Sequence, residues 1–291
     1  MSGPAARWWT ALVVLCCAPF LGVSANDDVS SQPLTIGTTY VVSTHDADRA
    51  MHVAVPPGYE DDERTYPLII MLDGGLDQDF HLTFGLYRWN QLWQRSEPAI
   101  FVGLQTVDRQ RKLLPLTDDP VERERYPTAG ESATFRTWIG DTILPLIRAR
   151  YRDDGRAFLI GESAAGHFVV ETWAYTPNMF DGYAAISPSL QWNDQSLSRV
   201  VEREASPKRP PLYVSLANEG GATEEGMIRL LRYSGPNTCF ADRRTELVHA
   251  DTLHGLLPEA LQYLLPTEAD WLDDFGLSLR CDDRLQPSVA P

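Results

Sequence analysis

The segment at residues 156–188 constrains the fold of this chain more than any other stretch. A short apolar run at 157–160 has the length of a buried strand, and an apolar-periodic stretch at 168–175 predicts a helix. Between them the chain turns within GESAAG (161–166). A serine on such a strand-to-helix turn is a nucleophile elbow, in which small residues on both sides of the serine keep the neighbouring chain clear. Gly161 and Ala165 take those places around Ser163. Ala165 departs from the usual G-x-S-x-G by one methyl group, which we expect the turn to accommodate.

Length and composition indicate a globular protein with one large α/β domain or two small ones. The chain has 291 residues, of which 43% are hydrophobic, so it is long and apolar enough to bury a sizeable core. Its formal net charge of −15 argues against nucleic acid and anionic membranes as partners. Because the acidic residues are spread along the chain, they are typical of a solvated surface.

The first 25 residues have the pattern of a secretory signal peptide. Arg7 precedes an apolar run at 8–21, and small residues at 23–25 suit cleavage. An uncleaved anchor is the alternative. The signal predicts an exported protein, periplasmic or secreted, without stable membrane association after cleavage, and a polar linker follows at 26–33.

Cysteine usage agrees with export. Cys16 and Cys17 would leave with the signal, so the mature chain keeps only Cys239 and Cys281. In an oxidising compartment this pair predicts one disulfide that ties down the tail, with two separate thiols as the alternative. No Cys/His spacing suits zinc and no calcium-loop pattern occurs, so we expect neither a metal nor a cofactor. The sequence leaves the oligomeric state open.

Strand and helix patterns alternate along the rest of the chain. Strands are expected at 34–44, 51–55, 66–72, 99–104, 157–160, 182–186, 212–217 and 245–249, and helices at 79–94, 132–150, 168–175, 224–233 and from 258 onward. This alternation predicts an α/β fold with a mainly parallel sheet and helices on both faces. One domain would cover 34–275, with a tail at 276–291. The long polar loop at 105–130 is expected to be functional or mobile.

A serine nucleophile needs a base, and the base needs an acid to orient it. After an elbow the chain order is serine, then acid, then histidine. His254, in the expected loop beyond the last strand, is the predicted base, whereas His249 falls inside that strand pattern. Glu219 ends the strand at 212–217 and is the predicted acid. Its rivals, Glu224 and Glu225, also suit the first turn of a helix.

An oxyanion hole needs two backbone N–H groups that point at the developing negative charge. Ala164, directly after the nucleophile, supplies one N–H at a helix N-terminus. The Gly-Gly pair after the strand at 66–72 supplies the other, and we assign it to Gly75.

Several segments in one order give the chain a resemblance to a known family. They are VPPGYEDDERTYPLIIMLDGG (55–75), RQRKLLP (109–115), FLIGESAAGHFVVE (158–171), FDGYAAISPSLQW (180–192), LYVSLANEGG (212–221) and LHGLLPEAL (253–261). Over residues 36–265 the chain resembles the putative-esterase family of α/β-hydrolases, which includes enterochelin esterases, feruloyl esterases, S-formylglutathione hydrolases and mycolyltransferases. The exported, enterobactin-esterase-like branch is the most similar.

The resemblance implies an α/β-hydrolase fold and a serine carboxylic-ester hydrolase that works through an acyl-enzyme. It also implies that Arg109 and Arg111 lie near the acyl or catechol pocket, although Lys112 and Leu114 depart from the family's R-x-R-D-L-T-P. Trp192, after the strand that follows the elbow, is a candidate aromatic wall of that pocket, and packing in the core is the alternative. The substrate would be a bulky ester, such as a siderophore, a feruloylated sugar or an acylated peptide. Two alternatives stay open: an acyltransferase on the same scaffold, and a binding protein that has kept the fold without turnover.

Overall fold

The computed structural model describes residues 30–43, 47–206 and 208–283. The predicted signal peptide therefore lies outside the described residues. From Ile36 onward the chain forms one compact unit.

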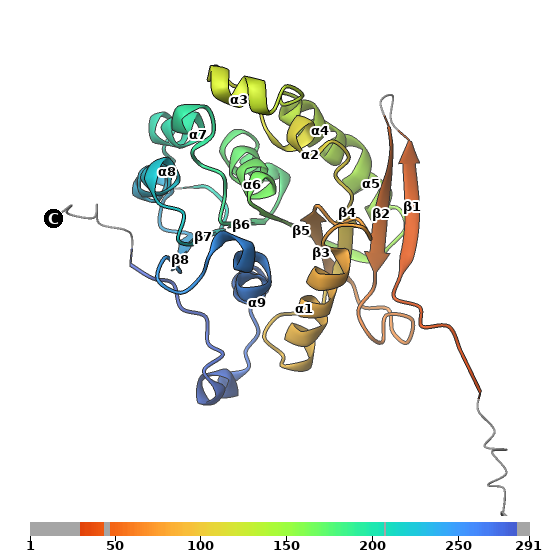
Figure 1. Cartoon of the computed structure of the whole chain (residues 1–291). Coiled ribbons are helices and arrows are strands. Elements are labelled where there is room, and N and C mark those ends of the chain that lie inside the picture. The colour runs from red at the N-terminus through yellow and green to blue at the C-terminus, as the bar shows by residue number, and fades with distance from the viewer. Residues whose placement is uncertain (1–29, 44–46, 207, 284–291) are drawn as a thin grey trace, which may run out of the picture. The chain divides into compact units, whose positions relative to one another are not determined.

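One eight-stranded sheet runs through this unit, in the order β1-β2-β4-β3-β5-β6-β7-β8 (Figure 1). The strands are β1 (Thr38–Ser43), β2 (Asp48–Ala54), β3 (Tyr66–Leu72), β4 (Ile100–Leu104), β5 (Asp153–Glu162), β6 (Gly182–Ile186), β7 (Leu212–Leu216) and β8 (Thr238–Asp242). β1 and β2 form an antiparallel pair at one edge, and β2 is also antiparallel to β4. The other pairs are parallel, so the strands from β3 to β8 end at the same edge of the sheet. The prediction of a mainly parallel α/β sheet is confirmed.

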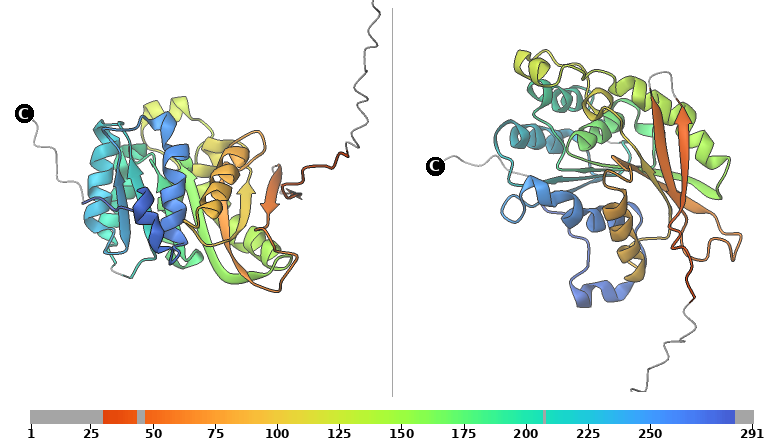
Figure 2. Two further views of the ribbon diagram at one scale, coloured as in Figure 1. Left: turned by 90° about the horizontal axis from the view of Figure 1, so that it is seen from below. Right: turned by 45° about the vertical axis from the view of Figure 1, so that its right-hand side comes forward.

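Helices cover both faces of the sheet, as Figure 2 shows from two further directions. They are α1 (Phe80–Leu92), α2 (Arg109–Leu113), α3 (Pro120–Arg125), α4 (Ser132–Trp138), α5 (Leu144–Arg148), α6 (Ala164–Tyr175), α7 (Trp192–Arg203), α8 (Gly221–Tyr233) and α9 (Thr252–Leu264). Successive strand residues point to opposite faces. Leu68 and Ile70 of β3 therefore join the core beneath α4, α6, α7 and α8, whereas Ile69 and Met71 join the core beneath α1 and α9. Figure 1 shows this division, with α1 and α9 on one side of the sheet.

Three sequence predictions need correction. The loop at 105–130 contains the short helices α2 and α3, and the helix expected from residue 258 begins at Thr252. The last strand is β8 (Thr238–Asp242), not 245–249. Its buried residues pair with β7, and the β-rich pattern at 245–249 belongs to the turn that follows. Pairing partners, rather than local β propensity, decide which run becomes a strand.

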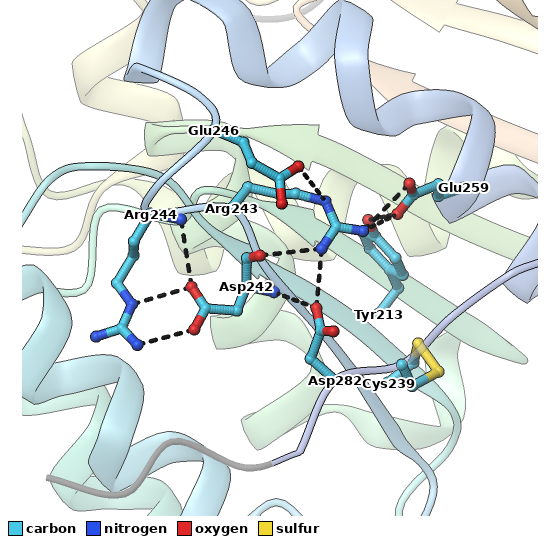
Figure 3. A network of polar contacts seen from close by, with 9 residues as sticks. Tyr213, Cys239, Asp242, Arg243, Arg244, Glu246, Glu259 and Asp282 are labelled. Atoms are coloured by element: carbon cyan, nitrogen blue, oxygen red, sulfur yellow. Dashed lines mark hydrogen bonds and ion pairs between the residues drawn. A yellow bond between two sulfur atoms is a disulfide. The ribbon is translucent and has the colours of Figure 1, made fainter.

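The C-terminal segment is fastened to β8 at the edge of the sheet (Figure 3). Cys239 and Cys281 form a disulfide, which confirms that prediction. Next to it, Asp282 Oδ2 accepts hydrogen bonds from Asp242 N and Arg243 Nη1, each at 2.8 Å. Arg243 also pairs with Glu259 of α9 at 3.0 Å. Covalent and ionic contacts therefore hold the tail at the same place.

Candidate active site

Ser163 sits on a strained turn between β5 and α6. Its φ of 60° and ψ of −117° lie in a region that non-glycine residues rarely adopt. Backbone hydrogen bonds fix this strained conformation: Ser163 N donates to Ile186 O at 3.0 Å, and Ser163 O accepts from Ser189 N at 3.0 Å. Strained residues that the surrounding structure fixes in this way cluster at active sites.

Gly161 explains why the chain tolerates Ala165. A side chain at position 161 would place its Cβ 2.7 Å from the backbone of Ala165 and 2.8 Å from the Ala165 methyl group. Because Gly161 has no Cβ, the Ala165 methyl fits and is fully buried. The predicted strand–turn–helix element therefore forms despite the departure from G-x-S-x-G.

His249, not His254, meets Glu219. His249 begins a short 3-10 turn, η3 (His249–Asp251), and Glu219 follows β7. The imidazole Nδ1 of His249 is hydrogen-bonded to Glu219 Oε1, which also accepts from Ser187 Oγ at 2.8 Å. The hydrogen bond to Glu219 raises the pKa of His249 above its usual value, and the negative charge of Glu162 adds to this effect.

His254 lies on α9, with half of its side chain exposed and its Nε2 3.8 Å from Asp251 Oδ1. The sequence predicts His254 as the partner of Glu219, but the structure pairs Glu219 with His249 instead. The prediction of His254 depended on placing the last strand at 245–249. In the structure the last strand ends at Asp242, so His249 lies in the segment that follows it. The rival acids have other partners, since Glu224 pairs with Arg244 and Glu225 accepts from Gln195 Nε2 at 2.9 Å.

Glu162 is a site residue that the sequence analysis missed. Its Oε1 lies 3.3 Å from His249 Nε2 and accepts a hydrogen bond from Thr252 Oγ1 at 3.1 Å. Burial raises the pKa of this carboxyl group. Its position next to the candidate nucleophile was the only signal in the sequence.

Ser163 and His249 line the same pocket, which has a volume of about 460 Å³. The lining residues are Asp73, Gln78, Asp79, Leu82, Arg109, Glu162, Ser163, His249, Ala250, Leu253 and His254. Over the described part of the chain, Ser163 Oγ has no hydrogen-bond partner, and His249 Nε2 faces Glu162. The described ranges contain no group of His, Cys, Asp and Glu side chains suited to a metal ion.

The three predicted substrate contacts differ in where they lie. Arg109 lines the pocket, where its Nε donates to Asp73 Oδ2 at 2.6 Å. Arg111 instead pairs with Asp108 at 3.2 Å and is not part of the pocket lining. Trp192 is buried, donates from Nε1 to Pro115 O at 3.1 Å, and does not reach the pocket either.

The predicted oxyanion donors lie after β3 and at the start of α6. Ala164 is the first residue of α6, where backbone N–H groups have no partner within the helix. Gly75 N donates to Gln78 Oε1 at 3.1 Å. Thr106 N donates to the same Gln78 oxygen at 3.2 Å. A substrate oxyanion would therefore have to displace or share the bond between Gly75 and Gln78.

Comparisons with known proteins show the family and the fold of the chain. The family model described as putative esterase matches residues 43–226. An IroE-like serine hydrolase from Shewanella oneidensis has a TM-score of 0.67 at 22% identity, over 79% of this chain and 80% of that one. The siderophore hydrolase EstA from Aspergillus nidulans has a TM-score of 0.68 at 17% identity, over 81% of this chain and 98% of that one. The enterobactin and salmochelin hydrolase IroE has a TM-score of 0.59 at 22% identity, over 79% and 95%. No curated protein matches the sequence.

Proposed function

Because the chain belongs to the putative-esterase family and is a carboxylic ester hydrolase, we propose that Ser163, His249 and Glu219 carry its reaction through an acyl-enzyme. The observation that supports this most directly is the hydrogen bond between His249 Nδ1 and Glu219, beside a pocket that Ser163 also lines. Serine, acid and histidine follow one another in the order that an elbow requires. His249 thus replaces His254 as the proposed base.

The reaction starts when His249 Nε2 turns from Glu162 to Ser163. Nε2 takes the Ser163 hydroxyl proton while Oγ attacks the ester carbonyl carbon, and the imidazolium then gives that proton to the departing alcohol. In the second half of the reaction, His249 Nε2 takes a proton from a water molecule while that water attacks the acyl carbon. The imidazolium then returns the proton to Ser163 Oγ, and the carboxylic acid leaves. Throughout, Glu219 holds Nδ1–H and stabilises the imidazolium.

Charge on the carbonyl oxygen would be stabilised by the N–H groups of Ala164 and Gly75. Ala164 is well suited, because it opens a helix of 12 residues. Gly75 would join when the substrate oxygen competes with the amide oxygen of Gln78. A Gln78→Ala variant tests this step, since it should free Gly75 N–H without removing it.

For the substrate we propose a bulky ester of the siderophore type. The pocket has room for part of such a molecule, and structures of similar fold carry the names siderophore hydrolase and enterobactin and salmochelin hydrolase. Those names describe the similar proteins. A panel of esters that differ in acyl length and aromatic content tests the assignment for this chain.

The decisive experiment compares His249→Ala with His254→Ala on one aryl ester, with Ser163→Ala as the reference. Loss of the base removes the covalent route, so we expect His249→Ala and Ser163→Ala each to lower kcat by at least about a thousandfold. His254→Ala is the matched control, because it removes a second pocket-lining imidazole. A phosphonate probe should label wild type at Ser163, as peptide mass spectrometry would show. If His254→Ala is the damaging change, the assignment of the base is wrong.

We also propose that the mature protein is exported. Support comes from the Cys239–Cys281 disulfide and from the signal pattern at 1–25. In the described part of the chain, no helix is long and apolar enough to cross a membrane. N-terminal sequencing of protein recovered outside the cytoplasm should begin near Asn26, and an intact N-terminus on cytoplasmic protein would contradict the proposal.

A further inference from the structure

His249 lies between two carboxylates. Glu219 binds Nδ1, and Glu162 Oε1 is 3.3 Å from Nε2. Nε2 is the nitrogen that must accept the Ser163 proton in the proposed reaction. Glu162 therefore occupies the position at His249 that the nucleophile needs.

Glu162 is fixed where it can hold this nitrogen. Its side chain is 19% exposed, and the hydroxyl of Thr252, which is fully buried, is shared between the same Oε1 at 3.1 Å and the backbone carbonyl of His249 at 2.8 Å. Arg109 Nη2 donates to the backbone carbonyl of Glu162 at 3.2 Å, at the end of β5. The Arg109 guanidinium also pairs with Asp73, so it only partly offsets the negative charge of the Glu162 carboxylate.

We propose that Glu162 is a positioning residue that holds the resting imidazole by Nε2 and releases it to Ser163 when His249 loses a proton. This inference rests on the proposed function, and it assigns a role to the residue just before the nucleophile.

The reason is the match of donors and acceptors. A protonated imidazole donates from both nitrogens and can bind both carboxylates at once. When Nε2 loses its proton, it becomes an acceptor that faces the acceptor oxygen of an ionised Glu162, and the contact turns from attractive to repulsive. The Ser163 hydroxyl is a donor in the same pocket, so the neutral imidazole gains a hydrogen bond by turning toward it.

Other charged groups around His249 also affect whether its imidazole is protonated. Glu219 faces it from the loop after β7, and Arg109 faces it from α2 and favours the neutral imidazole. Asp73, just after β3, Asp79, just before α1, and His254 of α9 also line the pocket. Among the residues that the structure describes, Glu162 alone has an ion-pair contact with Nε2, the nitrogen that has to change partner.

A titration without turnover tests the role of Glu162 separately from the esterase proposal. In a Ser163→Ala background, proton NMR follows the His249 ring protons with pH, with and without Glu162→Gln. The amide keeps the shape of the side chain and removes its charge, so we expect the His249 pKa to fall. Asp251→Asn is the matched control, because it removes one carboxylate that contacts His254 and not His249. An unchanged His249 pKa in Glu162→Gln, or an equal shift in Asp251→Asn, would overturn the proposal.

Kinetics on the enzyme with Ser163 intact give the second measurement. In Glu162→Gln the acidic limb of kcat/KM should move to lower pH, while Glu162→Asp should retain part of the wild-type profile. If Glu162→Gln does not fold, Glu162→Ala removes the same carboxylate, and the limb should move in the same direction. A limb that stays in place in the folded variant refutes the inference. If the wild type hydrolyses no ester, the proposed function fails, but the NMR titration still tests Glu162.

Discussion

Breaking the Cys239–Cys281 bond should destabilise the fold without disturbing the active site. The two cysteines are 42 residues apart. In the chain-entropy model, a closed loop of that size lowers the entropy of the unfolded chain enough to stabilise the protein by about 4 kcal/mol. For a chain of this size, that free energy corresponds to a fall in Tm of roughly 8–16 °C. Measured contributions of disulfides range from about 0 to 5 kcal/mol, so this value lies near the top of that range.

Other contacts will hold part of the tail after reduction. The turn η4 (Asp270–Phe275) packs Trp271 and Phe275 against Trp93, with ring centroids 6.0 and 5.7 Å apart. Asp282 still pairs with Arg243, although 40% of the Asp282 side chain is exposed. A surface ion pair of this kind contributes about 0–1 kcal/mol. We therefore expect the disulfide to outweigh the ion pair.

The assay compares denaturant midpoints of oxidised and reduced protein, which have the same sequence. Cys239→Ala combined with Cys281→Ala gives a second, reductant-free comparison, and Asp282→Asn is the control that keeps the disulfide. Phosphonate labelling of Ser163 should proceed equally in all forms under native conditions. Equal midpoints for oxidised and reduced protein, or two free thiols in unreduced exported protein, would refute the reasoning.

Three further predictions concern catalysis. Glu219→Gln should lower kcat by at least about tenfold, because His249 Nδ1 loses its anionic partner, while Glu225→Gln should change kcat little. If steady-state kinetics instead show the larger loss of kcat in Glu225→Gln, Glu225 is the acid and Glu219 is not. Because Glu219 raises the pKa of His249 and activity needs the neutral imidazole, the acidic limb of kcat/KM should lie above pH 6.5, and a midpoint below that value would contradict the contact. Since Asp79 and Glu162 line the pocket while Arg109 is already paired, an ester with an ammonium group should have a higher kcat/KM than its carboxylate counterpart, and Asp79→Asn should narrow the difference.

Features whose signals are local can be predicted from the amino-acid sequence alone. The order of apolar strand, tight turn and helix around Ser163 needs only neighbouring residues, and the alternation of strands and helices gives the parallel sheet. The disulfide could also be predicted from the sequence, since only two cysteines lie outside the predicted signal peptide. The sequence also predicts Glu219 as the acid, because it follows a buried strand, β7, whose apolar run is unambiguous.

Which histidine meets Glu219 depends on long-range packing and could not be predicted from local sequence patterns. Residues 238–242 and 245–249 are both short and rich in β-forming residues, and the choice between them depends on pairing with β7, a strand more than 20 positions earlier. Pairing put 238–242 in the sheet and left His249 in the turn beside Glu219. The contact between Glu162 and His249 joins residues 87 positions apart, and the burial of Trp192 depends on Pro115 and Tyr126. Such contacts form only when the sheet and its covering helices pack together, because no local pattern records which side chains will meet.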